Sequence, residues 1–328
     1  MKDNNFIKKS FVTVVIPTYN RKDSLIDCIN SLIDQTYPKE AYEIIVVDDG
    51  STDGTAELFK RNFTGVIYPR LRYIYQINRG SYAARNNGIK NALGDIICFT
   101  DDDCVVDKNW VKNIVSGFSG DKIAGVGGEI QSFKPETLAQ KYCQRYNPID
   151  VGELKKIFFP TANVAYLKSV LQEIDGFDDY FRESGDVDIG LRVRLKEYSL
   201  NYISSAIVYH KHRRSIYNLV KSSYIYAIGY AELHKKYPKN FNFFTRFINI
   251  LYLLIRKTIF IPIKISKDMI FYDDKILAFT SPLIDCARYI SSLLGLIIGT
   301  FFRQNYSGHK IYTKLEFLNE LKGIKWGN

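Results

Sequence analysis

Three adjacent carboxylates, Asp101, Asp102 and Asp103, directly follow the apolar run Ile96–Phe99, which is typical of a buried strand. Like charges this close repel each other, and grouping them costs free energy unless a cation neutralises them. Hard divalent cations such as Mg²⁺ or Mn²⁺ take carboxylate oxygens and usually keep open positions for substrate phosphates. The cluster therefore predicts a metal-assisted phosphate site at the end of a strand. A solvated Asp-rich turn is the alternative, because Asp is a common turn former.

The elements that must position this cluster alternate along the first 105 residues. Apolar patterns predict strands over 12–17, 43–48, 73–75 and 95–100, and helices over 24–35, from 55 onward and over 82–92. Residues 22–24 supply the cap chemistry of the first helix. Continuous apolar strands that alternate with helices favour a parallel sheet covered on both faces. Ligands of such sheets bind beyond the carboxyl ends of the strands, where residues 17–20, 48–51 and 101–103 all lie.

The pattern from residue 123 to residue 208 is more mixed. It predicts strands over 123–130, 160–166 and 201–209, and a helix over 187–196. Glycines at 125, 127 and 128 could suggest a phosphate loop, but no Lys-Ser or Lys-Thr pair follows them. We therefore expect a strand with close backbone packing there.

The positive charge of the chain is concentrated in its last third. The net charge is +10, but residues 211–328 hold 19 Lys and Arg against 7 Asp and Glu, or +12, which leaves −2 for the remainder. Residues 243–265 and 283–302 are apolar, although charges interrupt both and Pro262 would break a helix. Basic and apolar character together indicate an anionic membrane surface, with helices lying in its interface. A transmembrane pair and the core helices of a second soluble domain are the alternatives.

The cysteines and the N-terminus indicate the compartment. Five cysteines without CxxC pairing or regular spacing are typical of reduced thiols in a cytosolic protein. Residues 1–10 are polar and contain no apolar signal region. We therefore expect the cytoplasmic face of the membrane, with peripheral or monotopic attachment.

Four motifs in a fixed order make the chain resemble a family 2 glycosyltransferase of the GT-A fold over residues 11–214. They are PTYNR at 17–21, VVDDGSTDGT at 46–55, NRGSYAARNNG at 78–88 and FTDDDC at 99–104. The resemblance implies an α/β fold, a Rossmann-like mixed sheet with helices on both faces. It also implies a domain over 1–215, with a nucleotide-sugar half at 11–105 and an acceptor half at 106–215. The basic, apolar region 216–328 would then be a helical membrane-associating part.

The resemblance assigns roles in donor binding. The matching residues are Pro17, Thr18 and Asn20 against the nucleoside, Asp49 or Asp48 on the base, and Asn78, Gly80 and Arg85 beside the nucleotide and its phosphates. Asn163 matches a segment near the donor sugar and the acceptor. The alternative for residues 48–54 is a helix-capping turn, and the alternative for Arg85 is a surface ion pair.

The resemblance also assigns a metal site. Asp101 and Asp103 match the Asp-x-Asp motif of the family, so Asp103 would bind Mn²⁺ or Mg²⁺ directly and Asp101 would contact the ribose or a metal-bound water. Asp102 fills the variable middle position. His210 matches a histidine that can complete the metal shell in related enzymes, although a solvated basic turn is the alternative at 208–214. The cation would stabilise the charge on a departing nucleoside diphosphate.

An inverting reaction also needs a base for the acceptor hydroxyl. Asp186 aligns with the catalytic Asp of the family, but Gly185 stands where a Glu usually precedes it. Asp188 and then Glu183 are the alternatives. A carboxylate at Asp188 would also be favoured simply by the start of a helix.

The sequence therefore predicts an inverting, metal-dependent glycosyltransferase. Its donor would be a nucleotide sugar, and its acceptor a glycan or lipid-linked hydroxyl in surface polysaccharide or lipid-linked glycan synthesis. A sugar-phosphate nucleotidyltransferase is one alternative, although PTYNRKDS replaces the Gly-rich basic loop that such enzymes need after the first strand. A non-catalytic carbohydrate or membrane scaffold is another, supported by the missing Glu. Nucleic acid is not an expected partner, because no recognition motif accompanies the basic residues.

Overall fold

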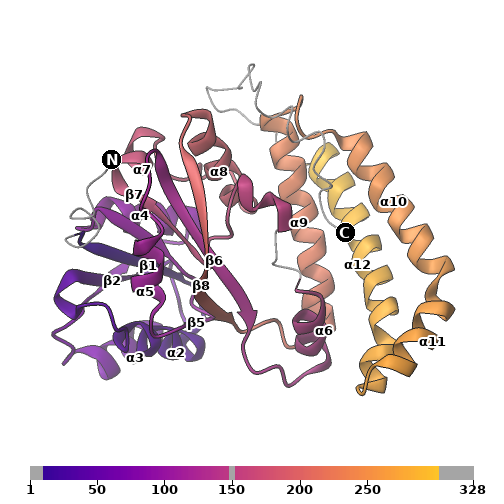
Figure 1. Cartoon of the computed structure of the whole chain (residues 1–328), viewed down its shortest axis with the longest axis horizontal. Helices are drawn as coiled ribbons and strands as arrows, with labels where there is room; N and C mark the ends of the chain where they lie inside the picture. Colours follow the sequence, from indigo (N-terminus) through magenta and orange to yellow (C-terminus); the bar gives the residue numbers. More distant parts are fainter. Residues whose placement is uncertain (1–9, 148–151, 303–328) are drawn as a thin grey trace. The chain divides into compact units, whose positions relative to one another are not determined.

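A computed structural model describes residues 10–147 and 152–302, which form two compact units (Figure 1). The first unit contains residues 10–133 and 152–211, and the second contains 134–147 and 212–302. The polar N-terminus and the last 26 residues of the predicted membrane-associating region lie outside the described residues.

The first unit is built on an eight-stranded mixed sheet with the order β3-β2-β1-β4-β7-β6-β8-β5. The first four strands run parallel, whereas β7 is antiparallel to β4 and β6, and β5 is antiparallel to β8. The mixed sheet predicted from the sequence is thus confirmed. The strands are β1 (Val12–Thr18), β2 (Tyr42–Asp48), β3 (Arg70–Tyr75), β4 (Ile96–Phe99), β5 (Cys104–Val106), β6 (Ile123–Ser132), β7 (Val164–Leu167) and β8 (Ser199–His210).

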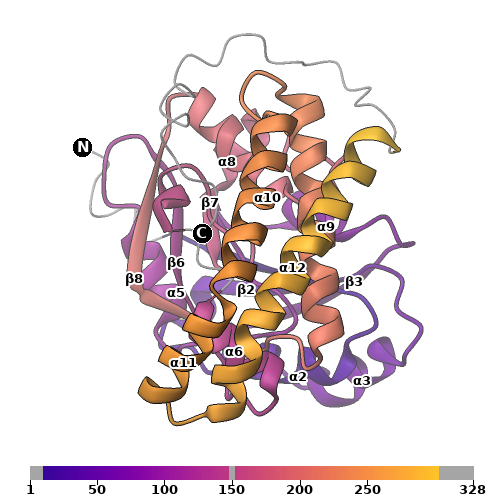
Figure 2. The ribbon, with the colours of Figure 1, turned by 90° about the vertical axis from the view of Figure 1, so that its right-hand side faces the viewer.

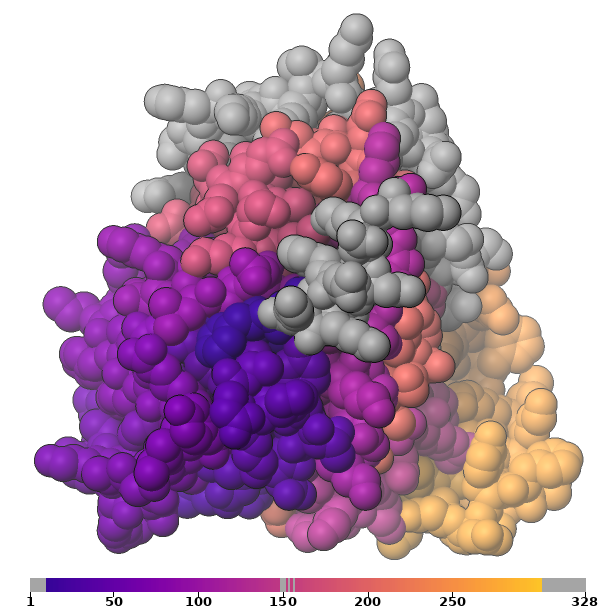
Figure 3. All heavy atoms as spheres, turned by 60° about the vertical axis from the view of Figure 1, so that its left-hand side comes forward, coloured from indigo at the N-terminus to yellow at the C-terminus, as the bar shows by residue number. Residues whose placement is uncertain are grey.

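Helices pack against this sheet (Figure 1), and every residue of β1, β2 and β4 is buried, as continuous apolar strands require. Gly88 lets α4 lie directly on β1, because a Cβ there would be 2.3 Å from Val15 Cγ1. The helices are α2 (Lys22–Ile33), α3 (Thr55–Phe63), α4 (Ser81–Asn91), α5 (Trp110–Ser116), α7 (Lys168–Glu173) and α8 (Gly185–Leu195), with short 3₁₀ turns at Lys39–Ala41 and Gly152–Lys156. Figure 3 shows one face of this unit, on which the indigo and violet residues form a continuous surface.

Two local predictions need correction or receive support. The predicted capping role of residues 22–24 is wrong, because α2 already begins at Lys22 and its N-cap, Arg21, makes no side-chain cap hydrogen bond. The glycine-rich segment is confirmed as a closely packed strand, because a Cβ at Gly127 would lie 2.1 Å from the Phe159 ring, and one at Gly128 would lie 2.0 Å from the Ala206 carbonyl oxygen.

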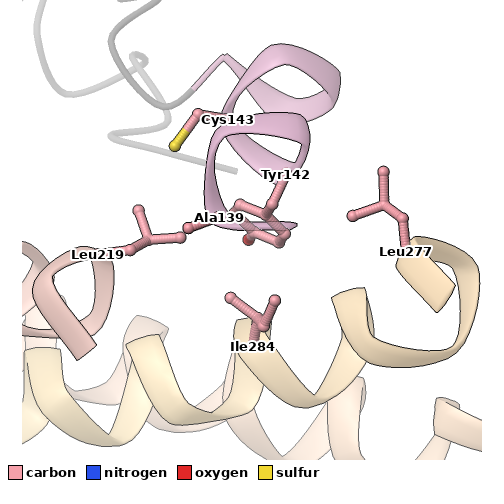
Figure 4. Close-up of a cluster of buried hydrophobic side chains, with 6 residues drawn as sticks. All are labelled: Ala139, Tyr142, Cys143, Leu219, Leu277 and Ile284. Atoms are coloured by element: carbon pink, nitrogen blue, oxygen red, sulfur yellow. The ribbon is translucent and has the colours of Figure 1, made fainter. Parts of the chain in front are cut away.

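The second unit consists of helices. Figure 2 shows α9, α10 and α12 side by side, and their buried contact is made by Ala227, Ala231, Ile250 and Leu296. A second apolar cluster joins α6, α9 and α12 through the six side chains of Figure 4: Ala139, Tyr142, Cys143, Leu219, Leu277 and Ile284. The helices are α6 (Leu138–Tyr146), α9 (Ile216–Lys236), α10 (Phe243–Ile259), α11 (Ile261–Phe271) and α12 (Lys275–Phe301). The predicted break at Pro262 is confirmed, because α10 ends and α11 begins on either side of Phe260.

Some of the charges that interrupt the apolar stretches form internal pairs in this unit. Lys257 Nζ lies 3.0 Å from Asp285 Oδ2, and Lys264 Nζ lies 3.0 Å from Asp268 Oδ2. Within the described ranges, α12 is the one helix that is long and apolar enough to cross a membrane, and 28% of its most apolar stretch is buried. Length and composition alone do not distinguish a spanning helix from one that packs on a surface.

Candidate active site

The polar segments after β1, β2 and β4 lie at one edge of the sheet, because these strands run parallel. Asn20 joins the first two segments: its backbone N–H donates to Ser51 Oγ at 2.9 Å, and its Oδ1 accepts from Thr52 N at 2.8 Å. Asn20 takes a φ of 52°, a left-handed conformation that Asn tolerates better than most residues. The edge of the sheet therefore carries a connected set of loops.

Two arginines hold the aspartate trio. Arg21 Nη1 donates to Asp103 Oδ2 at 2.6 Å and to Asp102 Oδ1 at 3.1 Å. Arg85 Nη2 donates to Asp101 Oδ1 at 2.5 Å. The three negative charges are thus compensated locally, as their proximity demands. The sequence analysis did not predict the contacts of Arg21. The position of Arg21 directly after the predicted nucleoside loop could have indicated them.

Asp102 differs from its two neighbours in being buried. Burial raises the pKa of the Asp102 carboxyl, and the charges of Asp103 and Asp101 raise it further, whereas Arg21 and a 2.8 Å hydrogen bond from Thr18 Oγ1 lower it. Asp102 therefore connects the trio to the end of β1, and Asp101 and Asp103 are the partly exposed members.

A possible cation site lies where β5 pairs with β8. The register places Cys104 opposite His210, and His210 Nε2 lies 3.4 Å from Asp103 Oδ1. Ligand atoms of Asp103, Cys104 and His210 all lie within 4.8 Å of one another. The buried Cys104 offers a soft sulfur atom, which does not match the oxygen preference of Mn²⁺ or Mg²⁺. The remaining carboxylate and imidazole fit Mn²⁺ or Mg²⁺ in ligand chemistry.

Asp49 holds the loop before α4. Its Oδ1 accepts from Gln76 Nε2 at 2.8 Å and Arg79 N at 2.9 Å, and its Oδ2 accepts from Gly80 N at 2.8 Å. A carboxylate offers about four acceptor positions, so one on Oδ2 remains for a ligand N–H. Gly80 has a φ of 96°, which side chains disfavour.

Asp48 is buried, as Asp49 is, and it accepts from Ser51 N at 2.8 Å and from the Tyr73 hydroxyl. The helix-capping alternative for this turn is only partly met: the N-cap of α3 is Gly54, without a side-chain bond, while Asp53 Oδ1 accepts from Thr55 N. Of the remaining residues predicted to bind the donor, Pro17 and Thr18 are buried at the end of β1, whereas Asn20 and Asn78 are exposed.

Arg85 is not the surface ion pair that the alternative interpretation supposed, since it is only 4% exposed. Its guanidinium lies 5.4 Å from the centre of the Tyr82 ring. Its Nε is buried, and no residue in the described ranges accepts a hydrogen bond from it. Arg85 thus combines a pair to Asp101 with spare donor capacity inside the site.

Asp186 is the second residue of α8 and is partly exposed, although protein surrounds most of it. Burial raises the pKa of its carboxyl to about 6, against the opposing effects of the Val187 backbone N–H and the positive charge of Arg85. Val187 N donates to Asp186 Oδ1 at 2.9 Å. A carboxylate with this pKa is ionised at neutral pH and is a stronger base than an ordinary aspartate.

The structure gives the other two candidate bases different surroundings. Asp188 is completely buried, and its Oδ2 accepts from both Nε and Nη2 of Arg192 at 2.8 Å. Arg192 also donates to the carbonyl oxygens of Ile174 and Gly176, so the pair fixes the start of α8 in the protein. Glu183 is half-buried in the turn before α8. This geometry favours Asp186 as the base.

Tyr82 explains why glycine precedes Asp186. Gly185 N donates to the Tyr82 hydroxyl at 2.9 Å, and a Cβ at position 185 would lie 2.7 Å from the Tyr82 ring. No side chain fits there without moving the ring, which also stacks against Phe177 at 5.4 Å. Sequence reasoning noticed the missing Glu but missed Tyr82, because nothing in the spacing links residues 103 positions apart.

The segment of Asn163 adjoins the trio, because Thr100 Oγ1 donates to the Ala162 carbonyl oxygen at 3.0 Å, but the Asn163 side chain itself has a structural environment. It is completely buried, its Oδ1 accepts from Trp110 Nε1 at 2.8 Å, and its amide donates to the carbonyls of Glu129 and Ala206. These bonds satisfy buried polar groups of β6 and β8, which is a structural role.

The chain is similar in sequence to several known proteins. The sequence profile of the group described as Glycosyl transferase family 2 matches residues 13–183. Glycosyltransferase AglE of Haloferax volcanii is 34% identical over 208 residues, which are 62% of this chain and 67% of the relative. A Methanococcus voltae enzyme is 26% identical over 267 residues, covering 75% of this chain and 83% of its own. Its printed name is dolichyl N-acetyl-alpha-D-glucosaminyl phosphate 3-beta-D-2,3-diacetamido-2,3-dideoxy-beta-D-glucuronosyltransferase. Several other curated relatives are longer, and the chain spans about half of their length or less.

A solved structure shows the same fold. The mannosyltransferase PcManGT from Pyrobaculum calidifontis, in complex with GDP-Man and Mn²⁺, superposes with a TM-score of 0.64 at 16% identity. The match covers 90% of this chain and 88% of PcManGT.

Proposed function

Because the chain belongs to glycosyl transferase family 2, we propose that it transfers a sugar from a nucleotide sugar to an acceptor hydroxyl, with inversion at the anomeric carbon. The predicted family and GT-A fold are confirmed. The observation that carries the proposed reaction is the placement of Asp103 and His210, 3.4 Å apart, at the edge of the sheet where the loops after three parallel strands meet.

The donor half of the proposed site uses residues of the first unit. Asp103 and His210 would hold Mn²⁺ or Mg²⁺, with Asp101 beside them. When bound, such a cation acts as a Lewis acid toward the diphosphate that leaves with the nucleoside. The free acceptor position of Asp49 suits an N–H of the donor base, and Asn20, Asn78 and Gly80 lie on the loops that would flank the nucleotide.

The acceptor half centres on Asp186. Its carboxylate would take the proton of the acceptor hydroxyl on the face of the sugar opposite the leaving group. The Val187 N–H and the Tyr82–Gly185 contact fix the start of α8 and therefore the position of this carboxylate. Asp188 and Glu183 are weaker proposals for the same step, since Asp188 is completely buried and pairs with Arg192 through Oδ2.

An assay of the released product tests the reaction class. The full chain, incubated with Mn²⁺ and a panel of UDP-, GDP- and dTDP-sugars, is expected to release nucleoside diphosphate from one donor class, slowly alone and faster with a lipid-linked or glycan acceptor. Release of pyrophosphate instead would indicate nucleotidyl transfer. Absence of turnover with every donor, together with absence of donor binding in a thermal-shift screen, would favour a scaffold.

We further propose that residues 1–215 form the catalytic part and that residues 216–328 associate with an anionic membrane, at its cytoplasmic face and near a lipid-linked acceptor. Residues 134–147 and 212–302 hold 16 Lys and Arg against six Asp and Glu. An exposed apolar face accompanies this charge, which is the pattern of an interfacial surface. On α10, α11 and α12 the large apolar side chains more than half exposed are Phe244, Ile248, Tyr252, Ile255 and Ile259 on α10, Ile263, Ile270 and Phe271 on α11, and Ile276, Phe279, Ile290, Leu294 and Phe301 on α12.

Vesicle sedimentation measures this association. The protein is expected to bind vesicles that contain anionic phospholipid, less so neutral ones, and to be released by high salt, because the charge contribution is screened. Replacing Ile270 and Phe271, which are 75% and 71% exposed, with Ser is expected to weaken vesicle binding at least tenfold. Burying each of these side chains in the membrane would contribute about 1.5 to 3 kcal/mol to binding. Ile67→Ser is the matched control, at 77% exposure in the first unit. Equal losses in the control and the double variant would contradict the proposed surface.

A further inference from the structure

Arg21 occupies one carboxylate oxygen of Asp103, beside the oxygen that faces His210. Its Nη1 lies 2.6 Å from Asp103 Oδ2 and 3.1 Å from Asp102 Oδ1, while Asp103 Oδ1 faces His210 Nε2 at 3.4 Å. A guanidinium and a divalent cation repel each other strongly at such separations. Binding of a cation at Asp103 therefore competes with the contact that Arg21 already makes.

Arg21 is the more exposed of the two arginines that hold the aspartate trio. Its side chain is 44% exposed, whereas that of Arg85, which pairs with Asp101, is 5% exposed. The backbone of Arg21 is fixed, because its carbonyl oxygen accepts from Ser24 N and Leu25 N at the start of α2. Motion is thus confined to a side chain anchored at the edge of the site, which can turn from the carboxylates toward a ligand beside them.

We propose that Arg21 is a mobile counter-ion of the aspartate trio: it compensates Asp102 and Asp103 until a divalent cation displaces it from Asp103, and it then binds the diphosphate of the donor. The inference rests on the proposed function. Displacement frees a planar donor group next to a site for an anion, and guanidinium binds phosphate oxygens through two parallel hydrogen bonds. Arg21 then opposes the cation alone but favours the cation together with the diphosphate, so the two ligands become coupled.

Titrations of the full chain with Mn²⁺ test the competition. Binding is measured by calorimetry or by the electron spin resonance signal of free Mn²⁺. Without a diphosphate, Arg21→Gln is expected to bind Mn²⁺ about twofold to fivefold more tightly than the wild type, as expected for the loss of one partly exposed ion pair. With inorganic pyrophosphate as the probe, the order should reverse, and Arg21→Gln should bind pyrophosphate with Mn²⁺ about tenfold more weakly. Lys122→Gln is the matched control for loss of one charge, because Lys122 is 68% exposed and pairs only loosely with Glu197, at 3.9 Å.

Thermal unfolding supplies a readout independent of activity. Without metal, Arg21→Gln leaves the charges of Asp102 and Asp103 poorly compensated, so its Tm is expected to fall below that of the wild type. Saturating Mn²⁺ should raise the Tm of Arg21→Gln by more than it raises the Tm of the wild type. Arg21→Lys retains the charge, but its ammonium is a point charge that lacks the guanidinium fork. Its Mn²⁺ affinity should therefore lie between those of the wild type and Arg21→Gln.

The outcomes separate this inference from the proposed function. Equal or weaker Mn²⁺ binding by Arg21→Gln, with the wild type binding normally, overturns the role of Arg21 and leaves the metal site intact. If neither protein binds Mn²⁺, with or without pyrophosphate, both proposals fail. The mobile counter-ion is supported if Arg21→Gln binds Mn²⁺ more tightly without pyrophosphate and binds pyrophosphate with Mn²⁺ more weakly, and if Lys122→Gln shows neither change.

Discussion

Asp103→Ala is expected to reduce kcat/KM for sugar transfer by about 10²- to 10³-fold or more, because it removes the carboxylate that would hold the cation at the leaving diphosphate. The fold should survive, since the Asp103 carbonyl oxygen, which accepts from Lys211 N at 2.8 Å, belongs to the backbone and is unchanged. Steady-state rates with Mn²⁺ and the best donor, measured beside the Mn²⁺ affinity of each protein, would separate loss of metal from loss of structure.

Two comparisons sharpen this test. Asp121→Ala removes an exposed carboxylate of the same unit and should leave both quantities within twofold of the wild type. His210→Ala should also weaken the cation, and the double variant should lose little more than Asp103→Ala alone, because residues that act through one ion are not additive. Donor turnover by Asp103→Ala that persists when Mn²⁺ is added would count heavily against the metal site.

The sequence predicted the first half of the sheet well because its information is local. β1, β2 and β4 are mostly apolar and buried throughout. The polar segments that follow them necessarily meet at one edge once the strands run parallel. The pairing of β5 with β8 is not local. It brings Cys104 opposite His210 across 106 positions, and only the resemblance to a family, not the spacing, pointed to His210.

Elsewhere the sequence could not predict which way a side chain points, and this limited the prediction of the site. Asn163 carries a polar group in a segment that resembled one near a donor sugar. Its amide nevertheless bonds Trp110 Nε1 and the carbonyl oxygens of Glu129 and Ala206 inside the protein. The sequence showed that Gly185 departs from the family pattern. The structure gives the reason, because the ring of Tyr82 leaves no room for a side chain at position 185. The boundary near residue 215 stays a prediction, and the structure adds that α6 packs among the helices of the second unit.

Asp186→Asn is the second change with a large expected effect. The amide keeps the size of the carboxylate but cannot accept the proton of the acceptor hydroxyl, so kcat should fall by about 10²- to 10⁴-fold. Affinity for Mn²⁺ and for the donor should remain, because Asp186 contacts neither Asp103 nor the loops after β1 and β2 by any bond in the described residues. Asp188→Asn is the informative comparison: it breaks a buried pair with Arg192, so it should cost about 3 to 5 kcal/mol of unfolding free energy.

The pH dependence distinguishes a base from a merely well-placed carboxylate. The pKa of Asp186 is raised from 3.8 to about 6, so the group is protonated and inactive below pH 6 and ionised above it. In the wild type, kcat/KM is therefore expected to rise tenfold per pH unit below about pH 6 and to level off above it. Asp186→Asn should lose this limb and keep a low, flat rate, whereas Asp188→Asn, measured below its unfolding temperature, should retain it. A wild-type profile without a limb near pH 6, or one that survives in Asp186→Asn, would place the base elsewhere and make Glu183 the next carboxylate to replace.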